Sequence, residues 1–135
     1  MKKFNNYLSA LASLSAAPDQ DLSNEFVQAG VINKFSLQFE LGWKLLKALL
    51  ALEGNPVASS GSPRDVLKAS FSWLDCLDEE TWLSMLRDRN TITHIYDAKS
   101  AEGLVATIVE TYLPAFQGLA DGVQERYGEE LDSLA

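Results

Sequence analysis

The chain has 135 residues, which is long enough for one domain with a sizeable hydrophobic core. Hydrophobic residues make up 47% of the chain and charged residues 22%, a balance that excludes a disordered protein. The formal net charge of -8 excludes a strong sequence-independent affinity for nucleic acid, so any RNA contact must be local. The expected source of such a basic patch is a set of four cations, Arg64, Lys68, Arg87 and Arg89.

The single cysteine, Cys76, has no partner for an intrachain disulfide, and this indicates a reducing, cytoplasmic compartment. We expect Cys76 to be a small buried side chain. No run of apolar residues is long enough to span a bilayer, so no membrane association is expected.

Two helices are predicted in the first half of the chain. Apolar residues at helical spacing predict a short amphipathic helix from about Lys3 to Ala16. A long second helix is predicted to start with Asp21 or Ser23 as its N-cap and to continue to Leu52. The turn-forming run Gly54-Asn55-Pro56 should then stop it.

The second helix carries the densest apolar seam of the chain, formed by Phe35, Phe39, Trp43 and Leu46. Because large aromatic side chains supply most of the burial energy of a bundle, we interpret this seam as core and not as a ligand surface. Glu40 lies next to the seam. It is expected either to sit at a solvated edge or to pair with Lys44, four residues further on.

Three more helices are predicted in the second half. After a loop from Gly54 to Ser62, Ser62 should cap a third helix that runs from Pro63 to about Leu74. Asp78 should cap a fourth helix, which ends in the stretch from Met85 to Asp97. A fifth helix is predicted from about Lys99 to Arg126, with a kink at Pro114.

No strand alternation, hairpin dipeptide or internal repeat interrupts this helical pattern. The number of long amphipathic helices and the short connections between them predict an all-α fold. We expect an up-and-down four-helix bundle with short additional helical segments, in a single domain over residues 1–135.

The stretch from Met85 to Asp97 holds the only histidine of the chain and is the candidate functional site. Projected as one continuous helix, Arg89, Asn90, His94 and Tyr96 lie on one broad polar arc that is too polar for the core. Arg89 and His94 are five residues apart, and an ideal helix would separate them by roughly 140°. Two copies of the stretch facing each other across a two-fold axis would instead form a composite pocket, which predicts a homodimer.

The residue types in this stretch suit phosphodiester chemistry. Histidine is the usual general acid or base near neutral pH, and arginine fixes a phosphate and stabilises charge that develops on it. With Asn90 and Thr93, they would support attack of a ribose 2′-OH on the neighbouring phosphate, a reaction that needs neither a metal nor a cofactor. The chain offers no metal-ligand cluster, nucleophile elbow or dinucleotide fingerprint.

Purely structural roles for the same residues stay open. His94, with Asp97 three residues on, could cap a helix or form a surface salt bridge. Arg87 and Arg89 could pair with acids on neighbouring helices, and Tyr96 could pack with its hydroxyl outward.

The run Arg89-Asn-Thr-Ile-Thr-His94-Ile-Tyr96 resembles the Arg-x4-His-x-Tyr motif of HepT-like toxins in the HEPN superfamily. The longer run from Met85 to Asp97 is similar to the nucleotidyltransferase substrate-binding protein family. The likeness extends over most of the chain, through Phe35 to Lys47, the Ser62-Pro63-Arg64-Asp65-Val66 segment, Trp82-Leu83 and the region around Pro114.

This resemblance implies a dimeric helical bundle that pairs with a minimal nucleotidyltransferase encoded nearby, in a toxin–antitoxin arrangement. Arg89 and His94 would then be the catalytic pair of an endoribonuclease that cuts RNA without a metal, and Asn90 would be a polar helper. Tyr96 would accept AMP from the partner, which silences the toxin. The alternative that the family implies is a non-catalytic substrate-binding subunit of the nucleotidyltransferase.

Overall fold

The computed structural model describes residues 1–95 and 97–134. Within these ranges the chain is helical and contains no strand, which confirms the predicted all-α fold. The α-helices are α1 (Lys2–Leu14), α2 (Glu25–Leu52), α3 (Val57–Ser60), α4 (Pro63–Phe71), α5 (Glu79–Thr91), α6 (Ala98–Thr107) and α7 (Leu113–Tyr127). Shorter 3₁₀ or π segments are η1 (Ala17–Asp19), η2 (Ile92–His94), η3 (Ile108–Tyr112) and η4 (Gly128–Ser133). No helix within the described ranges combines the length and apolar character that crossing a bilayer requires.

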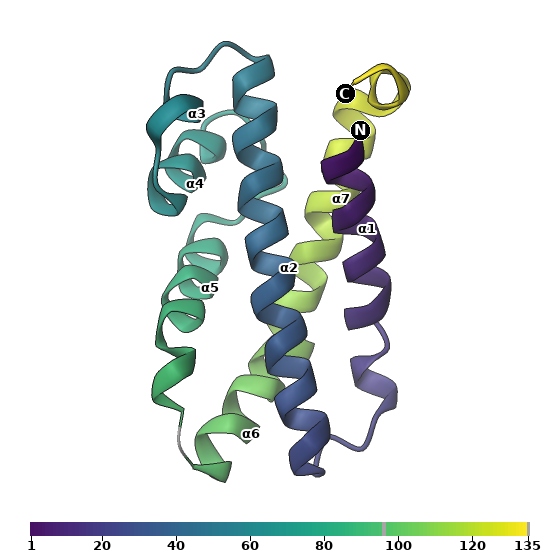
Figure 1. Ribbon diagram of the computed structural model, residues 1–135, viewed down its shortest axis with the longest axis vertical. Helices are drawn as coiled ribbons and strands as arrows, with labels where there is room; N and C mark the ends of the chain where they lie inside the picture. Colours follow the sequence, from purple (N-terminus) through teal and green to yellow (C-terminus); the bar gives the residue numbers. More distant parts are fainter. Residues whose placement is uncertain (96, 135) are drawn as a thin grey trace.

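The helices form the predicted up-and-down four-helix bundle (Figure 1). The long helix α2 lies at its centre and contacts α1 on one side and α4, α5 and α6 on the other. The fourth position of the bundle is filled by the continuous run α6–η3–α7, which returns to the end of the bundle where the chain starts. The short helices α3 and α4 form the expected additional segments beside the upper part of α2.

Side-chain caps explain where three of the helices begin. Ser62 and Asp65 form a reciprocal capping box on α4, and the Asp78 carboxylate accepts the Thr81 N–H at the start of α5, so both predicted caps are confirmed. The predicted cap of α2 is wrong by one to three residues. Asn24, and not Asp21 or Ser23, accepts the first free N–H groups of α2.

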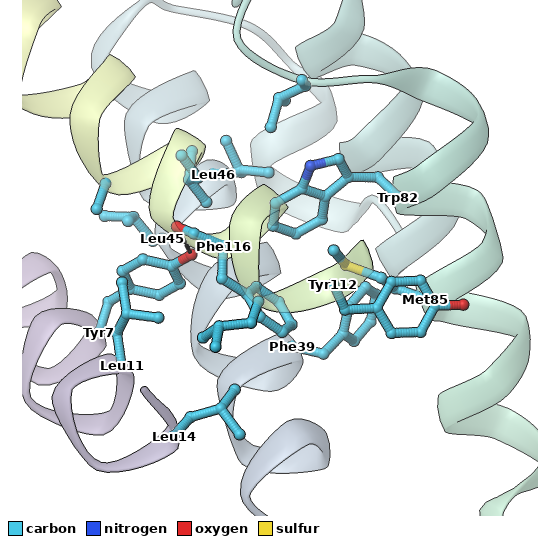
Figure 2. Close-up of a cluster of buried hydrophobic side chains, with 14 of the residues drawn as sticks. Tyr7, Leu11, Leu14, Phe39, Leu45, Leu46, Trp82, Met85, Tyr112 and Phe116 are labelled. Carbon is cyan, nitrogen blue, oxygen red and sulfur yellow. Dashed lines mark hydrogen bonds between the residues drawn. The ribbon is translucent and has the colours of Figure 1, made fainter. Parts of the chain in front are cut away.

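Three of the four residues of the predicted seam, Phe35, Phe39 and Leu46, lie in the buried core, whereas Trp43 is only partly buried at its edge. Figure 2 shows Phe39 and Leu46 among the core side chains. Phe35 and Phe39 are fully buried, and the fully buried Trp82 of α5 packs edge-on against Phe116 of α7, with ring centroids 5.6 Å apart. Tyr7 of α1 donates its hydroxyl hydrogen to the Phe116 carbonyl over 2.7 Å, and burial raises the Tyr7 pKa well above its usual value. The buried aromatic groups therefore hold the four main positions of the bundle together.

The structure corrects three smaller expectations. The expected loop from Gly54 to Ser62 contains the short helix α3, and the third predicted helix ends at Phe71 and not at Leu74. Cys76 is exposed and not buried. Its sulfur still packs tightly against α7, because a Cβ added at Gly122 would lie 2.3 Å from it.

The expected irregularity at Pro114 takes the form of the π segment η3, directly before α7. Proline has no N–H group, and its ring collides with the carbonyl four residues earlier in a regular α-helix. A locally wider turn accommodates the proline without ending the helix.

Candidate functional site

The predicted site residues lie at and beyond the C-terminal end of α5. Arg89 is half-buried and Asn90 exposed in the last turn of α5, and His94 is exposed at the end of the 3₁₀ segment η2. Tyr96 lies outside the described residues. Asp97 is the N-cap of α6 and accepts the Ser100 N–H over 2.7 Å, a role that the sequence analysis did not assign to it.

The expectation of one continuous helix from Met85 to Asp97 is wrong. α5 ends at Thr91, η2 follows, and Ile95 is extended. Of the residues from Thr91 to Ile95, all but His94 are β-branched and are poor helix formers, and Asp97 competes for the backbone as a strong cap. Arg89 and His94 are therefore on different elements, and the angle expected between them on a single helix does not apply.

Arg89 is held in place by two residues of α2. Its Nη1 donates to Glu40 Oε2 over 2.9 Å, and its guanidinium carbon lies 5.4 Å from the centroid of the Phe39 ring. The side chain keeps 25% of its surface exposed, while its buried Nε has no hydrogen-bond partner among the described residues. Arg89 thus forms the ion pair with a neighbouring helix that was one of the alternatives, and it still offers guanidinium donors at the surface.

Glu40 connects Arg89 to two further donors. Lys44 Nζ lies 3.2 Å from Glu40 Oε1, as predicted, and Trp43 Nε1 donates to Oε2 over 3.0 Å. Partial burial by itself would raise the pKa of Glu40. The hydrogen bonds from Trp43 and Lys44 and the charges of Lys44 and Arg89 outweigh it, and the pKa is lowered from 4.5. Glu40 is therefore an ionised anchor for Arg89.

A second network holds α5 against η3, and sequence reasoning missed it. The Tyr112 hydroxyl donates to the Asp88 carboxylate and lies 2.8 Å from Ser84 Oγ. Burial and the hydrogen bond to Asp88 raise the pKa of Tyr112 to about 12, so it stays protonated and keeps donating. The signal in the sequence was the spacing of Ser84 and Asp88, which places two polar groups on one face of a helix that packs on an apolar neighbour.

A hollow of about 710 Å³ opens between the start of α4 and the second half of α5. Arg64 of α4 and Arg87, Arg89 and Asn90 of α5 line it. The structure thus brings together three of the four cations expected to form a basic patch, whereas Lys68 is not part of the lining. Guanidinium groups are well suited to bind a phosphate, because each can donate two parallel hydrogen bonds. Across residues 1–95 and 97–134, no three His, Cys, Asp or Glu side chains come together as metal ligands.

A different hollow, of about 380 Å³, lies beside η2 and has a mainly apolar lining. Ile92 and Ile95, which flank His94 in the sequence, form it together with Ala29 and Ile32 of α2. In the sequence, His94 follows the residues of the basic hollow and is flanked by two residues of the apolar one.

The comparison with protein families identifies the chain. Residues 2–125 match the family described as nucleotidyltransferase substrate binding protein like. The chain belongs to this family. No curated protein matches it at a significant level. The match covers every element from α1 to most of α7, including the arginine-lined hollow and the stretch that carries His94, which confirms the resemblance noted in the sequence. Membership of the nucleotidyltransferase substrate-binding family implies association with a nucleotidyltransferase.

Proposed function

We propose that this protein is a metal-independent endoribonuclease toxin of the HEPN type, paired with a minimal nucleotidyltransferase encoded nearby. The observation that carries the proposal is that Arg89 and Asn90, in the last turn of α5, line an arginine-rich hollow. The next element along the chain, η2, ends at His94. A phosphate-binding group and a group that can move a proton are thus available at one end of the bundle. In this proposal the substrate is cellular RNA, the protein acts in the cytoplasm, and the reaction uses no cofactor.

The proposed reaction is an internal transfer at the phosphodiester. His94 takes the proton of the ribose 2′-OH, the 2′ oxygen attacks the phosphorus, and the bond from phosphorus to the 5′ oxygen breaks. The leaving 5′ oxygen takes a proton from water, and the hydroxide that forms takes back the proton held by His94. The products are a 2′,3′-cyclic phosphate and a 5′-OH, with His94 again neutral. Arg89 donates to the non-bridging oxygens, where negative charge develops, and Asn90 adds a neutral donor.

The ion pair with Glu40 orients Arg89 for this role. Glu40 engages Nη1, while the cation–π contact with Phe39 holds the guanidinium group over the aromatic ring. Because Trp43 and Lys44 also donate to Glu40, its carboxylate keeps partners when a phosphate draws Arg89 toward the substrate. Glu40 and Phe39 are positioning residues in this proposal.

The active form in this proposal is a homodimer. One chain presents Arg89 and His94 on separate elements, and a second copy would bring another set of both to the same RNA. The apolar lining next to His94, formed by Ile92, Ile95 and residues of α2, supports a contact at this end of the bundle.

Tyr96 is the proposed site at which the partner attaches AMP. The modification adds a negative charge and bulk two residues from His94. An adenylate there would compete with RNA for the guanidinium groups and so silence the toxin.

The test is RNA cleavage by the purified protein without its partner, in the presence of a chelator. We expect cleavage to cyclic-phosphate ends, and a loss of about 10²-fold or more in His94→Ala, the size typical of general acid–base catalysis. Arg89→Gln should be similarly impaired, whereas Lys99→Ala, which removes an exposed cation of α6, should cleave normally. Equal growth of cells that express wild type or His94→Ala without the partner would contradict the proposal.

A second candidate function is a non-catalytic subunit that presents a substrate to the nucleotidyltransferase. The pairing of Arg89 with Glu40 and the net charge of -8 favour it, because both reduce the positive potential available to RNA. In this case the nucleotidyltransferase should co-purify with the chain, and cleavage should be absent at every pH tested.

A further inference from the structure

The arginine-lined hollow extends well beyond the two residues that the proposed chemistry uses. Arg64 and Arg87 are exposed cations from two different helices, and both line the same hollow as Arg89. Arg87 Nη2 donates to Ser84 Oγ over 3.0 Å, which directs that side chain without neutralising it. Within the described part of the chain, neither Arg64 nor Arg87 forms an ion pair.

Three acidic groups on α2, α4 and α5 already have partners. Asp65 accepts from the Ser62 backbone in the capping box of α4, Asp88 accepts the Tyr112 hydroxyl, and Glu40 is paired with Arg89 and Lys44. Two guanidinium groups that form no ion pair within the described residues thus face one hollow, on a chain whose net charge is -8. Like charges held together repel each other, so an anion is the ligand that this arrangement favours.

The rest of the lining points to the backbone of a nucleic acid. Ser62 and Asn90 add neutral polar side chains, and Pro63, Leu83 and Leu86 are aliphatic. Among residues 1–95 and 97–134, no aromatic side chain contributes to the lining. Without an aromatic platform, base stacking contributes less to affinity, and the charged guanidinium groups favour phosphates as the main ligand. We propose that Arg64 and Arg87 form a subsite for the phosphates of single-stranded RNA that lie next to the bond at Arg89. This inference rests on the proposed function for the identity of the ligand.

The expected binding has a measurable signature. For single strands, each neutralised phosphate adds about 0.7 to the slope of log affinity against log salt concentration. Loss of both arginines should therefore lower this slope by about 1.4. Because the subsite contacts only phosphates, an oligonucleotide made only of uridine and one made only of adenosine should bind with similar affinity.

The experiment is fluorescence anisotropy with a 2′-O-methylated single-stranded oligonucleotide, which the proposed chemistry cannot cut. We compare wild type with Arg64→Gln/Arg87→Gln, which should bind about tenfold more weakly at moderate salt and show the reduced slope. The matched control is Lys2→Gln/Lys3→Gln, which removes two exposed cations from α1, on the other side of α2 (Figure 1). Its affinity should change by less than about twofold, because charges beyond a Debye length are screened.

Arg64→Lys/Arg87→Lys serves as a second variant that keeps both charges. It should keep the wild-type salt slope, and circular dichroism should show that all variants are folded. An unchanged slope in Arg64→Gln/Arg87→Gln, or no binding by wild type at low salt, overturns the subsite. If Arg64→Gln/Arg87→Gln no longer binds the nucleotidyltransferase but binds RNA as wild type does, the hollow is a contact for the protein partner. This result would also overturn the RNA subsite. RNA binding through the subsite without any cleavage by wild type would remove the proposed nuclease and leave the subsite intact.

Discussion

The pair Glu40–Arg89 allows a direct test of how firmly the site is built, because the same carboxylate also pairs with Lys44. The Arg89 contact is 2.9 Å, with 25% of the arginine side chain exposed, whereas the Lys44 contact is 3.2 Å, with 51% of the lysine exposed. Exposed helical pairs four residues apart contribute about 0.3–0.5 kcal/mol. Arg89 is less solvated and bridges two helices, so we expect a coupling of about 1 kcal/mol with Glu40.

Two double-mutant cycles measure these couplings. One combines Glu40→Gln with Arg89→Gln, and the other combines Glu40→Gln with Lys44→Gln. Each free energy of unfolding comes from urea titration. With an unfolding entropy of about 2.1 cal/mol/K per residue, a coupling of about 1 kcal/mol corresponds to about 4 °C in Tm for a chain of this size. Equal couplings in the two cycles, or none between Glu40 and Arg89, would refute the anchoring of Arg89.

The same pair predicts a dependence of stability on pH. The pKa of Glu40 is lower in the folded chain than its usual value of 4.5. A carboxyl group whose pKa falls on folding stabilises the fold while it is ionised, and this contribution disappears as the pH falls through the folded pKa. The stability difference between wild type and Glu40→Gln should therefore be constant near neutral pH and shrink below about pH 4.5.

Three further predictions concern other parts of the chain. Tyr112→Phe should lower the free energy of unfolding by about 1–3 kcal/mol, because Asp88 loses a partly buried donor; in an absorbance titration it should also remove the phenol that ionises at a pKa of about 12. Gly122→Ala should cost about 1–3 kcal/mol in urea titration, because its Cβ would lie 2.3 Å from the Cys76 sulfur, and Cys76→Gly in the same chain should restore most of the loss. Incubation with the nucleotidyltransferase and ATP should add AMP to wild type and not to Tyr96→Phe in mass spectrometry, and no adduct on wild type would exclude modification of this tyrosine.

Local patterns in the sequence were sufficient to predict the bundle. The four-residue spacing of Phe35 and Phe39 identified the buried face of α2, and both are fully buried. Two caps could be predicted from the residues that follow them. Ser62 directly precedes a proline at the first helical position, and Asp78 directly precedes an acidic first turn. Asn24 was missed because several polar residues in succession can all cap a helix, and only tertiary packing selects between them.

The site was harder to predict because its geometry depends on contacts between distant segments. Residue type and motif spacing singled out Arg89 and His94, but the bond from Arg89 to Glu40 spans 49 residues. No periodicity argument reveals such a contact. The end of α5 at Thr91 was also missed. The helical projection assumed a continuous helix, although the β-branched residues that follow have poor helix propensity.

The π segment η3 keeps the last long helical run aligned with the bundle. Along the run α6–η3–α7, one buried residue follows another at intervals of four: Leu104, Ile108, Tyr112 and Phe116. In a regular α-helix, three such steps would rotate the stripe by about 120° away from its starting direction. The wider turn takes up part of this rotation, so that all four side chains can face α2 and α5. Deleting one residue from η3 should therefore change the phase of everything after it and turn the Tyr112 hydroxyl away from α5.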